Sequence, residues 1–223
     1  MNPEQLAGLI DHTLLSASAV QADIERLCAE AKQYGFAAVC VNPCWVPLAA
    51  QRLADSGIGI ATVVGFPLGA NRSAVKAAEA MDAIRAGATE IDMVMNIGAF
   101  KSGDYAAALQ DVKAVADACK GRAMLKVIIE TCYLTEDEKK RAALLCREAG
   151  ADFVKTSTGF GTAGATVEDV ALILAVVGPG MGIKASGGIR DAAFARQLVA
   201  AGANRLGASA SVAIVGGARG AGY

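Results

Sequence analysis

Two lysines stand out because each ends an apolar, strand-like run and is followed at once by small polar residues and glycine. Lys155 lies between Phe-Val and Thr-Ser-Thr-Gly, and Lys184 lies between Met-Gly-Ile and Ala-Ser-Gly-Gly. Two ammonium groups held close together in partly desolvated surroundings disfavour each other's charge, which lowers the pKa of at least one. A lysine that is neutral near pH 7 can attack a carbonyl and form a Schiff base. Either lysine alone could equally extend to water or contact a phosphate, but the pair beside glycine-rich segments favours catalysis.

A carboxylate and a third lysine lie in two other apolar runs. Asp92 occurs in Glu-Ile-Asp-Met-Val-Met, a segment too apolar to bury a carboxylate without a partner. A lysine would supply that partner, and the acid could then move protons directly or through water. The alternative is a purely structural ion pair. Lys126, in Met-Leu-Lys-Val-Ile-Ile-Glu, is either a third charge in the same cavity or an outward residue between helices. The sequence does not choose between these two positions.

Three glycine-rich segments follow successive strand-like runs and are suited to binding phosphate. Glycine lets backbone N–H groups close around an anion, and a helix N-terminus adds a favourable dipole. One such segment is weak evidence because turns also need glycine, whereas three that converge form a stronger signal. They are Thr158-Gly-Phe-Gly-Thr-Ala-Gly, Ser186-Gly-Gly-Ile-Arg and Gly207-Ala-Ser.

The single histidine, His12, directly follows Asp11 and could suggest a catalytic dyad. A buried, hydrogen-bonded structural histidine is the favoured interpretation. Serine hydrolase chemistry has no support, because the chain has no Gly-x-Ser-x-Gly motif and its histidine lies near the N-terminus.

Short β-branched runs alternate with amphipathic, Ala-rich stretches along the whole chain. The stretches have apolar residues three and four positions apart and charges on the other face, which predicts helices. Several of these stretches end at a glycine within a repeated Ala-Gly-Ala motif, as is typical of helices that end in a left-handed glycine cap. The predicted strands are Leu9–Thr13, Ala37–Val41, Gly59–Val64, Glu90–Val94, Met124–Ile129, Asp152–Lys155, Gly182–Lys184 and Arg205–Gly207. The predicted helices are Ala19–Gln33, Ser73–Ala86, Ala106–Cys119, Glu136–Ala149, Val167–Val177 and Asp191–Ala201.

This alternation predicts an α/β fold, a (β/α)8 TIM barrel formed by one domain over residues 1–223. A doubly wound open sheet is the competing architecture, but no Gly-x-Gly-x-x-Gly follows the first strand. In a barrel, the residues at and beyond the C-terminal strand ends form the active site, and the loops after strands seven and eight often bind phosphate.

The composition excludes several classes of function. Apolar residues make up 54% of the 223 residues, which supports a large core rather than a disordered chain. A net charge of −1 and 5% aromatic residues argue against nucleic-acid or anionic-membrane partners. The longest uncharged stretch contains two prolines, and the first basic residue is Arg26, so neither a spanning helix nor a signal peptide is expected. The 6 cysteines form no Cys-x-x-Cys pair, which is typical of reduced, mostly buried thiols in a cytoplasmic protein.

These motifs together resemble the deoxyribose-phosphate aldolase family over nearly the whole chain. The combination of Val-Lys-Thr-Ser-Thr-Gly with Lys-Ala-Ser-Gly-Gly is highly specific. The matching blocks are Asp11-His-Thr-Leu-Leu, Val39-Cys-Val-Asn-Pro, Val64-Gly-Phe-Pro-Leu-Gly, Glu90-Ile-Asp-Met-Val-Met-Asn, Lys126-Val-Ile-Ile-Glu-Thr, Phe153-Val-Lys-Thr-Ser-Thr-Gly-Phe, Ile183-Lys-Ala-Ser-Gly-Gly-Ile-Arg and Leu206-Gly-Ala-Ser.

The resemblance implies a class I aldolase on a TIM barrel that needs no metal or other cofactor. Such enzymes reversibly cleave 2-deoxy-D-ribose 5-phosphate to D-glyceraldehyde 3-phosphate and acetaldehyde. By motif, Lys155 would form the Schiff base, and Lys184 would lower its pKa and join Asp92 in moving protons. Further expected substrate contacts are Asp11 and Thr158 near the sugar hydroxyls, and Gly159, Gly187, Gly188 and Ser209 at the phosphate.

The chain departs from some relatives at its periphery. Phe160 stands where some have lysine, and Ala210 interrupts a Ser-Ser pair, so phosphate affinity would depend more on backbone amides, with Arg190 as the nearest arginine. Some relatives use a C-terminal tyrosine that reaches back to the site. Tyr223 could do the same through its flexible glycine-rich neighbours, or could belong to a disordered tail.

Two rival functions remain open at this point. One is another Schiff-base barrel enzyme, such as a transaldolase or keto-acid aldolase, and the other is a non-catalytic phosphosugar-binding barrel. The expected partners are small phosphosugar and aldehyde substrates. Family members are commonly dimers or tetramers, so a homo-oligomer is expected by analogy.

Overall fold

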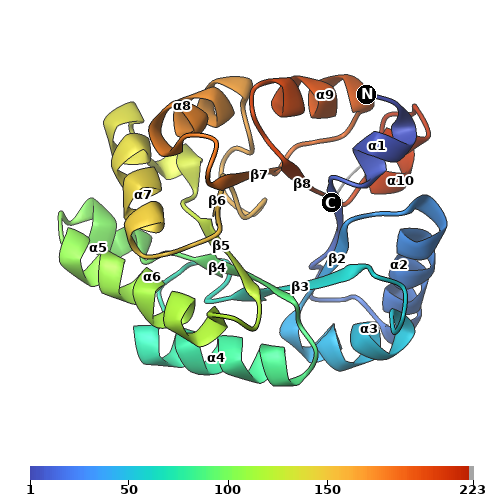
Figure 1. The fold of residues 1–223 in the computed structure, drawn as a ribbon, viewed down its shortest axis with the longest axis horizontal. Coiled ribbons are helices and arrows are strands. Elements are labelled where there is room, and N and C mark those ends of the chain that lie inside the picture. The colour runs from blue at the N-terminus through green and yellow to red at the C-terminus, as the bar shows by residue number, and fades with distance from the viewer. Residues whose placement is uncertain (221–223) are drawn as a thin grey trace.

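The computed structural model describes residues 1–220 and folds them into a closed barrel of parallel strands (Figure 1). Each strand pairs with the next in chain order, and β8 closes the ring on β1, where Leu206 lies opposite Ile10. The alternative of an open, doubly wound sheet is therefore wrong. The strands are β1 Ile10–Leu14, β2 Ala38–Val41, β3 Gly59–Val64, β4 Glu90–Val94, β5 Met124–Ile128, β6 Phe153–Lys155, β7 Gly182–Ser186 and β8 Arg205–Ala208.

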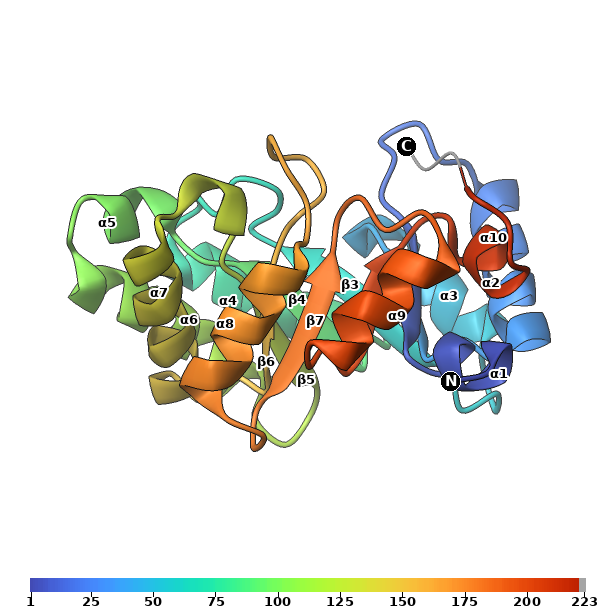
Figure 2. The same cartoon turned by 90° about the horizontal axis from the view of Figure 1, so that it is seen from above.

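Helices surround the barrel, and Figure 2 shows them alongside the strands in the perpendicular view. The longer helices are α2 Gln21–Tyr34, α4 Ser73–Arg85, α6 Tyr105–Cys119, α7 Glu136–Glu148, α8 Val167–Val177 and α9 Ala192–Ala200. The shorter ones are α1 Pro3–Ala7, α3 Val46–Arg52, α5 Ile97–Lys101 and α10 Ser211–Val215, with single 3₁₀ turns η1 Pro43–Trp45 and η2 Thr131–Tyr133. None of the helices in residues 1–220 has the length and apolar character required to cross a membrane.

Local sequence explains where the main helices begin and end. Helix α7 begins at a capping box in which Thr135 and Glu138 each bond the other's backbone N–H. Helix α2 ends at Gly35, which has a φ of 68° and caps the helix in the left-handed conformation predicted from the sequence. Short joints of this kind return the chain directly to the next strand.

The apolar residues form two separate clusters. The larger lies between the strands and the surrounding helices, as expected for strands covered on their outer face. The smaller lies inside the barrel and contains Leu15, Cys40, Ala61 and Val63. It lies on the side of β1 to β3, and buried charged side chains from β4 to β7 lie elsewhere in the interior.

Four short helices, α1, α3, α5 and α10, are absent from the sequence prediction. They have 5 to 7 residues, too few for a periodic apolar pattern to emerge. The expected end of the seventh strand is also wrong, because β7 continues to Ser186 and places Lys184 at its centre. Of the 6 cysteines, 4 are buried as expected, whereas Cys44 is exposed and Cys132 is half-buried.

Candidate active site

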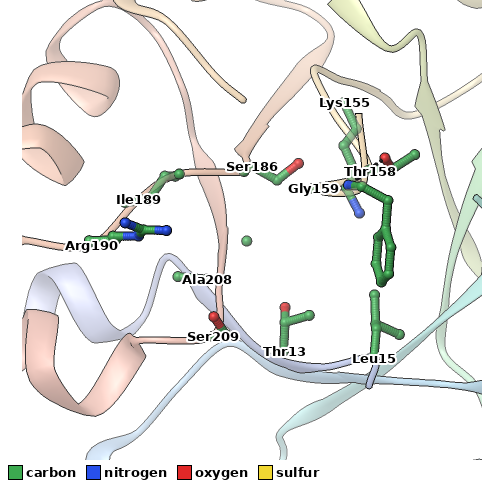
Figure 3. A pocket seen from close by; sticks show the side chains of 14 residues that line it. Thr13, Leu15, Lys155, Thr158, Gly159, Ser186, Ile189, Arg190, Ala208 and Ser209 are labelled. Atoms are coloured by element: carbon green, nitrogen blue, oxygen red, sulfur yellow. Dashed lines mark hydrogen bonds between the residues drawn. The ribbon is translucent and has the colours of Figure 1, made fainter. Parts of the chain in front are cut away.

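A cavity opens at the C-terminal ends of β6, β7, β8 and β1, where the fold class predicts an active site (Figure 3). Figure 3 shows Lys155 and Thr158 on one side, with Arg190 and Ser209 on the other. The lining residues are Thr13, Leu15, Lys155, Thr158, Gly159, Phe160, Ser186, Gly187, Gly188, Ile189, Arg190, Gly207, Ala208 and Ser209. Lys155 and all three glycine-rich segments are thus brought together as the sequence predicts.

Asp92 lies beneath this cavity and connects the three lysines of the barrel interior. Its Oδ2 atom is 2.7 Å from the Nζ atoms of both Lys155 and Lys184. Its Oδ1 atom accepts a hydrogen bond from Lys126 at 2.9 Å. The side chain of Asp92 is fully buried. Lys126 is therefore inside the barrel, which decides the question that the sequence leaves open.

A second level of charge lies below Asp92, towards the N-terminal ends of the strands. Asp11 accepts a hydrogen bond from Lys184, and its other oxygen lies 2.7 Å from Arg205 Nη1. Arg205 also bonds Glu90 at 3.1 Å, and Glu90 pairs with Lys126. Each of these carboxylates has a cationic partner, as buried charges require.

The surroundings of Lys155 and Lys184 move the pKa values of these two lysines in opposite directions. Burial lowers the pKa of Lys155, and the nearby charge of Lys184 lowers it further, although Asp92 opposes both effects. Burial also disfavours the charged form of Lys184, but Asp11 and Asp92 together raise the pKa of that lysine above its ordinary value. Of these two lysines, Lys155 therefore loses its proton more readily, and Lys184 stays charged.

The carboxyl groups respond in the opposite sense. Burial alone would raise the pKa of Asp92, but Lys126, Lys155 and Lys184 hold it well below the usual range. Similarly, burial is outweighed at Asp11 by Lys184, Lys126 and Arg205, which lower its pKa to about 2. Both acids are ionised at neutral pH.

The predicted sugar-binding residues occupy different positions relative to the cavity. Thr158 lines it, whereas Asp11 is fully buried and is connected to Lys155, which lines the cavity, only through Lys184 and Asp92. His12 lies on the outer face of β1, where its Nε2 atom is 2.8 Å from Glu30 Oε2 and burial lowers its pKa. His12 is therefore buried and hydrogen-bonded, as expected. Tyr223 lies outside the described residues.

At the rim of the cavity, Phe160 contributes an apolar side chain and Arg190 contributes a positive charge. Phe160 is 54% exposed, and its ring meets the edge of Phe66 at 5.3 Å between centroids. Arg190 is exposed and has no ion-pair partner in residues 1–220. Gly187 and Gly188 also line the cavity and have φ angles of 85° and 78°, in the left-handed region that favours glycine.

Sequence reasoning does not select Glu130, Glu90 or Arg205. Glu130 comes two residues after the end of β5, so the rule about C-terminal strand ends could have identified it. Glu90 and Arg205 begin their strands and lie at the opposite end of the barrel, where that rule gives no signal.

A parallel barrel with a buried lysine at the C-terminal end of β6, next to a second lysine and an aspartate, defines a class of enzymes that attack carbonyl compounds through an amine. The family model for DeoC/LacD family aldolases matches residues 6–221. The chain belongs to that family.

The individual relatives agree over almost the entire chain. It is 55% identical to the deoxyribose-phosphate aldolase of Enterococcus faecalis, with 98% of this chain and 100% of the relative covered. It is 57% identical to that of Bacillus cereus, with 94% of each chain covered. A solved, tetrameric structure of the deoxyribose phosphate aldolase from Aeropyrum pernix is 36% identical, covers 96% of this chain and 91% of its own, and has a TM-score of 0.90.

Proposed function

We propose that this protein reversibly cleaves 2-deoxy-D-ribose 5-phosphate to D-glyceraldehyde 3-phosphate and acetaldehyde through a Schiff base on Lys155. The observation that carries the proposal is the position of Lys155, whose amine reaches the cavity while its Nζ atom lies 2.7 Å from Asp92. Relatives at 55% and 57% identity that are named deoxyribose-phosphate aldolase support the same substrate.

The reaction begins with the neutral amine of Lys155 adding to the C1 aldehyde of the open-chain sugar. A proton passes from nitrogen to oxygen to give a neutral carbinolamine, a second proton from the acid–base groups beside Lys155 protonates its hydroxyl, water leaves, and a positively charged iminium remains. Loss of the C3 hydroxyl proton then lets the C2–C3 bonding electrons pass to the iminium nitrogen, which releases glyceraldehyde 3-phosphate and forms an enamine. Protonation at C2 and addition of water release acetaldehyde and restore the amine.

Asp92 and Lys184 supply the proton movements near Lys155. Asp92 Oδ2 lies within hydrogen-bond distance of the Nζ atoms of Lys155 and Lys184. A proton that leaves one of these lysines can therefore be replaced from the other through Asp92. Burial and, in addition, the fixed charge of Lys184 keep the pKa of Lys155 low before each turnover. We assign catalytic roles to Lys155, Lys184 and Asp92 on this basis.

The substrate phosphate would bind at the other side of the cavity from Lys155. The backbone of Gly187 and Gly188, the hydroxyl of Ser209 and the guanidinium of Arg190 provide donors there. Gly159 and Thr158 line the wall nearer to Lys155, where the sugar chain would lie. Asp11 would act on the sugar only indirectly, through Lys184, Asp92 and Lys155.

We also propose that the whole chain acts as one domain, that it assembles as a homo-oligomer and that it is cytoplasmic. The tetrameric relative supports the assembly. Light scattering coupled to size-exclusion chromatography tests it, since a monomer at micromolar concentration would contradict the proposal.

The activity is tested by following acetaldehyde release from 2-deoxyribose 5-phosphate with a coupled alcohol dehydrogenase. We expect turnover by the wild type and none by Lys155→Met. Condensation assays with acetaldehyde, dihydroxyacetone and pyruvate as donors separate this function from that of a transaldolase or a keto-acid aldolase. The proposed function predicts activity with acetaldehyde alone. Binding of the sugar phosphate without turnover would instead indicate a binding protein.

A further inference from the structure

Glu130 combines two features that cost free energy at one position. It follows β5 with a φ of 53°, in the left-handed region that residues other than glycine rarely adopt. Its carboxylate is only 2% exposed and has no cationic partner within residues 1–220. Such a residue persists only where its surroundings compensate for both costs.

Within residues 1–220, all hydrogen bonds to the carboxylate of Glu130 come from Thr158, in the loop after β6. The backbone N–H of Thr158 donates to the two carboxylate oxygens of Glu130 at 3.2 and 3.3 Å. The hydroxyl of Thr158 donates to Glu130 Oε2 as well. That same hydroxyl accepts the backbone N–H of Phe160 at 3.0 Å.

These bonds determine whether the Thr158 hydroxyl can donate a hydrogen bond to a substrate or accept one from it. A carboxylate only accepts hydrogen bonds, so the single hydroxyl proton of Thr158 must point to Glu130. One oxygen lone pair is used by Phe160, and the remaining one is available at the cavity wall. Thr158 is therefore set to accept a hydrogen bond from a substrate hydroxyl and cannot donate one.

Glu130 also fixes the loop at Thr158, directly after the first point that is held. The start of the loop is fixed to β7, because Ser186 Oγ donates to Ser157 O at 2.6 Å. The end is fixed where Ala165 N donates to Ser186 O at 3.0 Å. Between these points, the hydrogen bonds that the structure shows leaving residues 158–164 all go to Glu130. This segment includes Thr158, Gly159 and Phe160, which line the cavity.

We propose that Glu130 is a positioning residue of the aldolase site, which fixes the Thr158–Phe160 segment and orients the Thr158 hydroxyl to accept a hydrogen bond from a sugar hydroxyl. This inference rests on the proposed function. Glu130 does not line the cavity and acts through Thr158. It affects the steps that involve the sugar hydroxyls and leaves the amine of Lys155 unchanged.

The test separates these steps by using two substrates. Acetaldehyde carries no hydroxyl, so its Schiff base with Lys155, trapped by borohydride, reports the amine alone. Cleavage of 2-deoxyribose 5-phosphate requires the sugar contacts as well. The variants are Glu130→Gln, Glu130→Gly and Thr158→Val, with Glu148→Gln on the exposed surface of α7 as the matched control.

For Glu130→Gly we expect kcat/KM with the sugar phosphate to fall roughly 10- to 100-fold. Glycine adopts the left-handed backbone without strain, so this variant removes the carboxylate and keeps the turn. Glu130→Gln, which keeps one accepting oxygen, should lose less. The rate of acetaldehyde trapping should stay within about twofold of the wild type in both variants, because the site of attack is intact.

A double-mutant cycle completes the test. If Glu130 acts through Thr158, Glu130→Gln combined with Thr158→Val should lose no more activity than Thr158→Val alone. The proposal would be overturned if the losses of activity in the two single variants added up in the double variant. It would also be overturned if kcat/KM were unchanged in Glu130→Gly, or if acetaldehyde trapping and sugar-phosphate cleavage fell equally. Failure of the wild type to trap acetaldehyde would instead overturn the proposed function.

Discussion

Lys155 and Lys184 face each other in register across β6 and β7, and one oxygen of Asp92 lies 2.7 Å from both ammonium nitrogens. Two like charges on adjacent strands are stable only with such a shared counter-ion. The two lysines nevertheless differ, because Lys184 has a second carboxylate partner in Asp11 and Lys155 does not. This asymmetry gives Lys155 the lowered pKa and Lys184 the raised one.

Replacing Lys184 by Met should slow the reaction and shift its pH dependence. The charge of Lys184 lowers the pKa of Lys155, so its loss raises that pKa and leaves less neutral amine at pH 7. We expect kcat to fall roughly 100-fold or more, with the rising limb of the pH–rate profile moved to higher pH. The control is Lys113→Met, which removes an exposed positive charge from α6. An unchanged rising limb would contradict the assignment.

Acid should unfold the protein partly through Asp11. Its pKa is about 2 in the folded state against an ordinary 3.8, so it contributes stability above pH 4 that is lost as the pH falls through 2. That contribution is about 2 kcal/mol. Urea unfolding of wild type and Asp11→Asn at pH 7 and at pH 3 measures it.

For Asp11→Asn we expect a loss of roughly 3 to 5 kcal/mol at pH 7, since Lys184 and Arg205 lose a buried partner. The difference between wild type and variant should narrow at pH 3. A difference that is the same at both pH values would show that the carboxylate of Asp11 does not titrate as described.

Gly207 is required for space beside Lys184. A Cβ atom at this position would lie 3.0 Å from Lys184 Cε and 3.0 Å from Ser186 Cβ. Gly207→Ala should displace Lys184 from Asp92 and reduce kcat between about 10- and 100-fold. It should also cost roughly 1 to 3 kcal/mol of unfolding free energy. Gly180→Ala is the control, because a Cβ atom at Gly180 would have no neighbouring atom within 4 Å. Equal kinetics in both variants would contradict this account.

Introducing a lysine at Phe160 should strengthen phosphate binding at the cavity rim. Phe160 is 54% exposed, so the new ammonium group can reach the anion while remaining hydrated. We expect KM for 2-deoxyribose 5-phosphate to fall roughly two- to fivefold at low salt. KM for unphosphorylated 2-deoxyribose should not fall. Leu144→Lys, on α7, controls for the change in net charge, and the same fall in KM there would refute the local effect.

Most of the fold could be predicted because parallel barrel strands are buried on both faces and therefore form clear apolar runs. The boundaries of β3 and β4 agree with the prediction at every residue. Helix α3 escapes prediction because its sequence, Val-Pro-Leu-Ala-Ala-Gln-Arg, is short and uncharged until its last residue. Such helices are formed by tertiary packing rather than by local pattern.

The site was predictable only in part, for a geometric reason. Lys155 ends its strand, so its position at the cavity follows from the fold class alone. Whether Lys126 points into the barrel or towards the helices depends on the register of its strand, because a shift of one residue moves every side chain to the opposite face. The partners of Asp92 and Asp11 come from strands more than 30 residues away, so the charge network emerges only in three dimensions.

The most direct measurement of the central claim is borohydride reduction during turnover of 2-deoxyribose 5-phosphate, followed by peptide mass mapping of the adduct. We predict a reduced adduct on Lys155 in the wild type and none in Lys155→Met. An adduct on Lys184 or Lys126 would reverse the assigned lysine roles. The absence of any adduct while the substrate is being cleaved would contradict the Schiff-base mechanism itself.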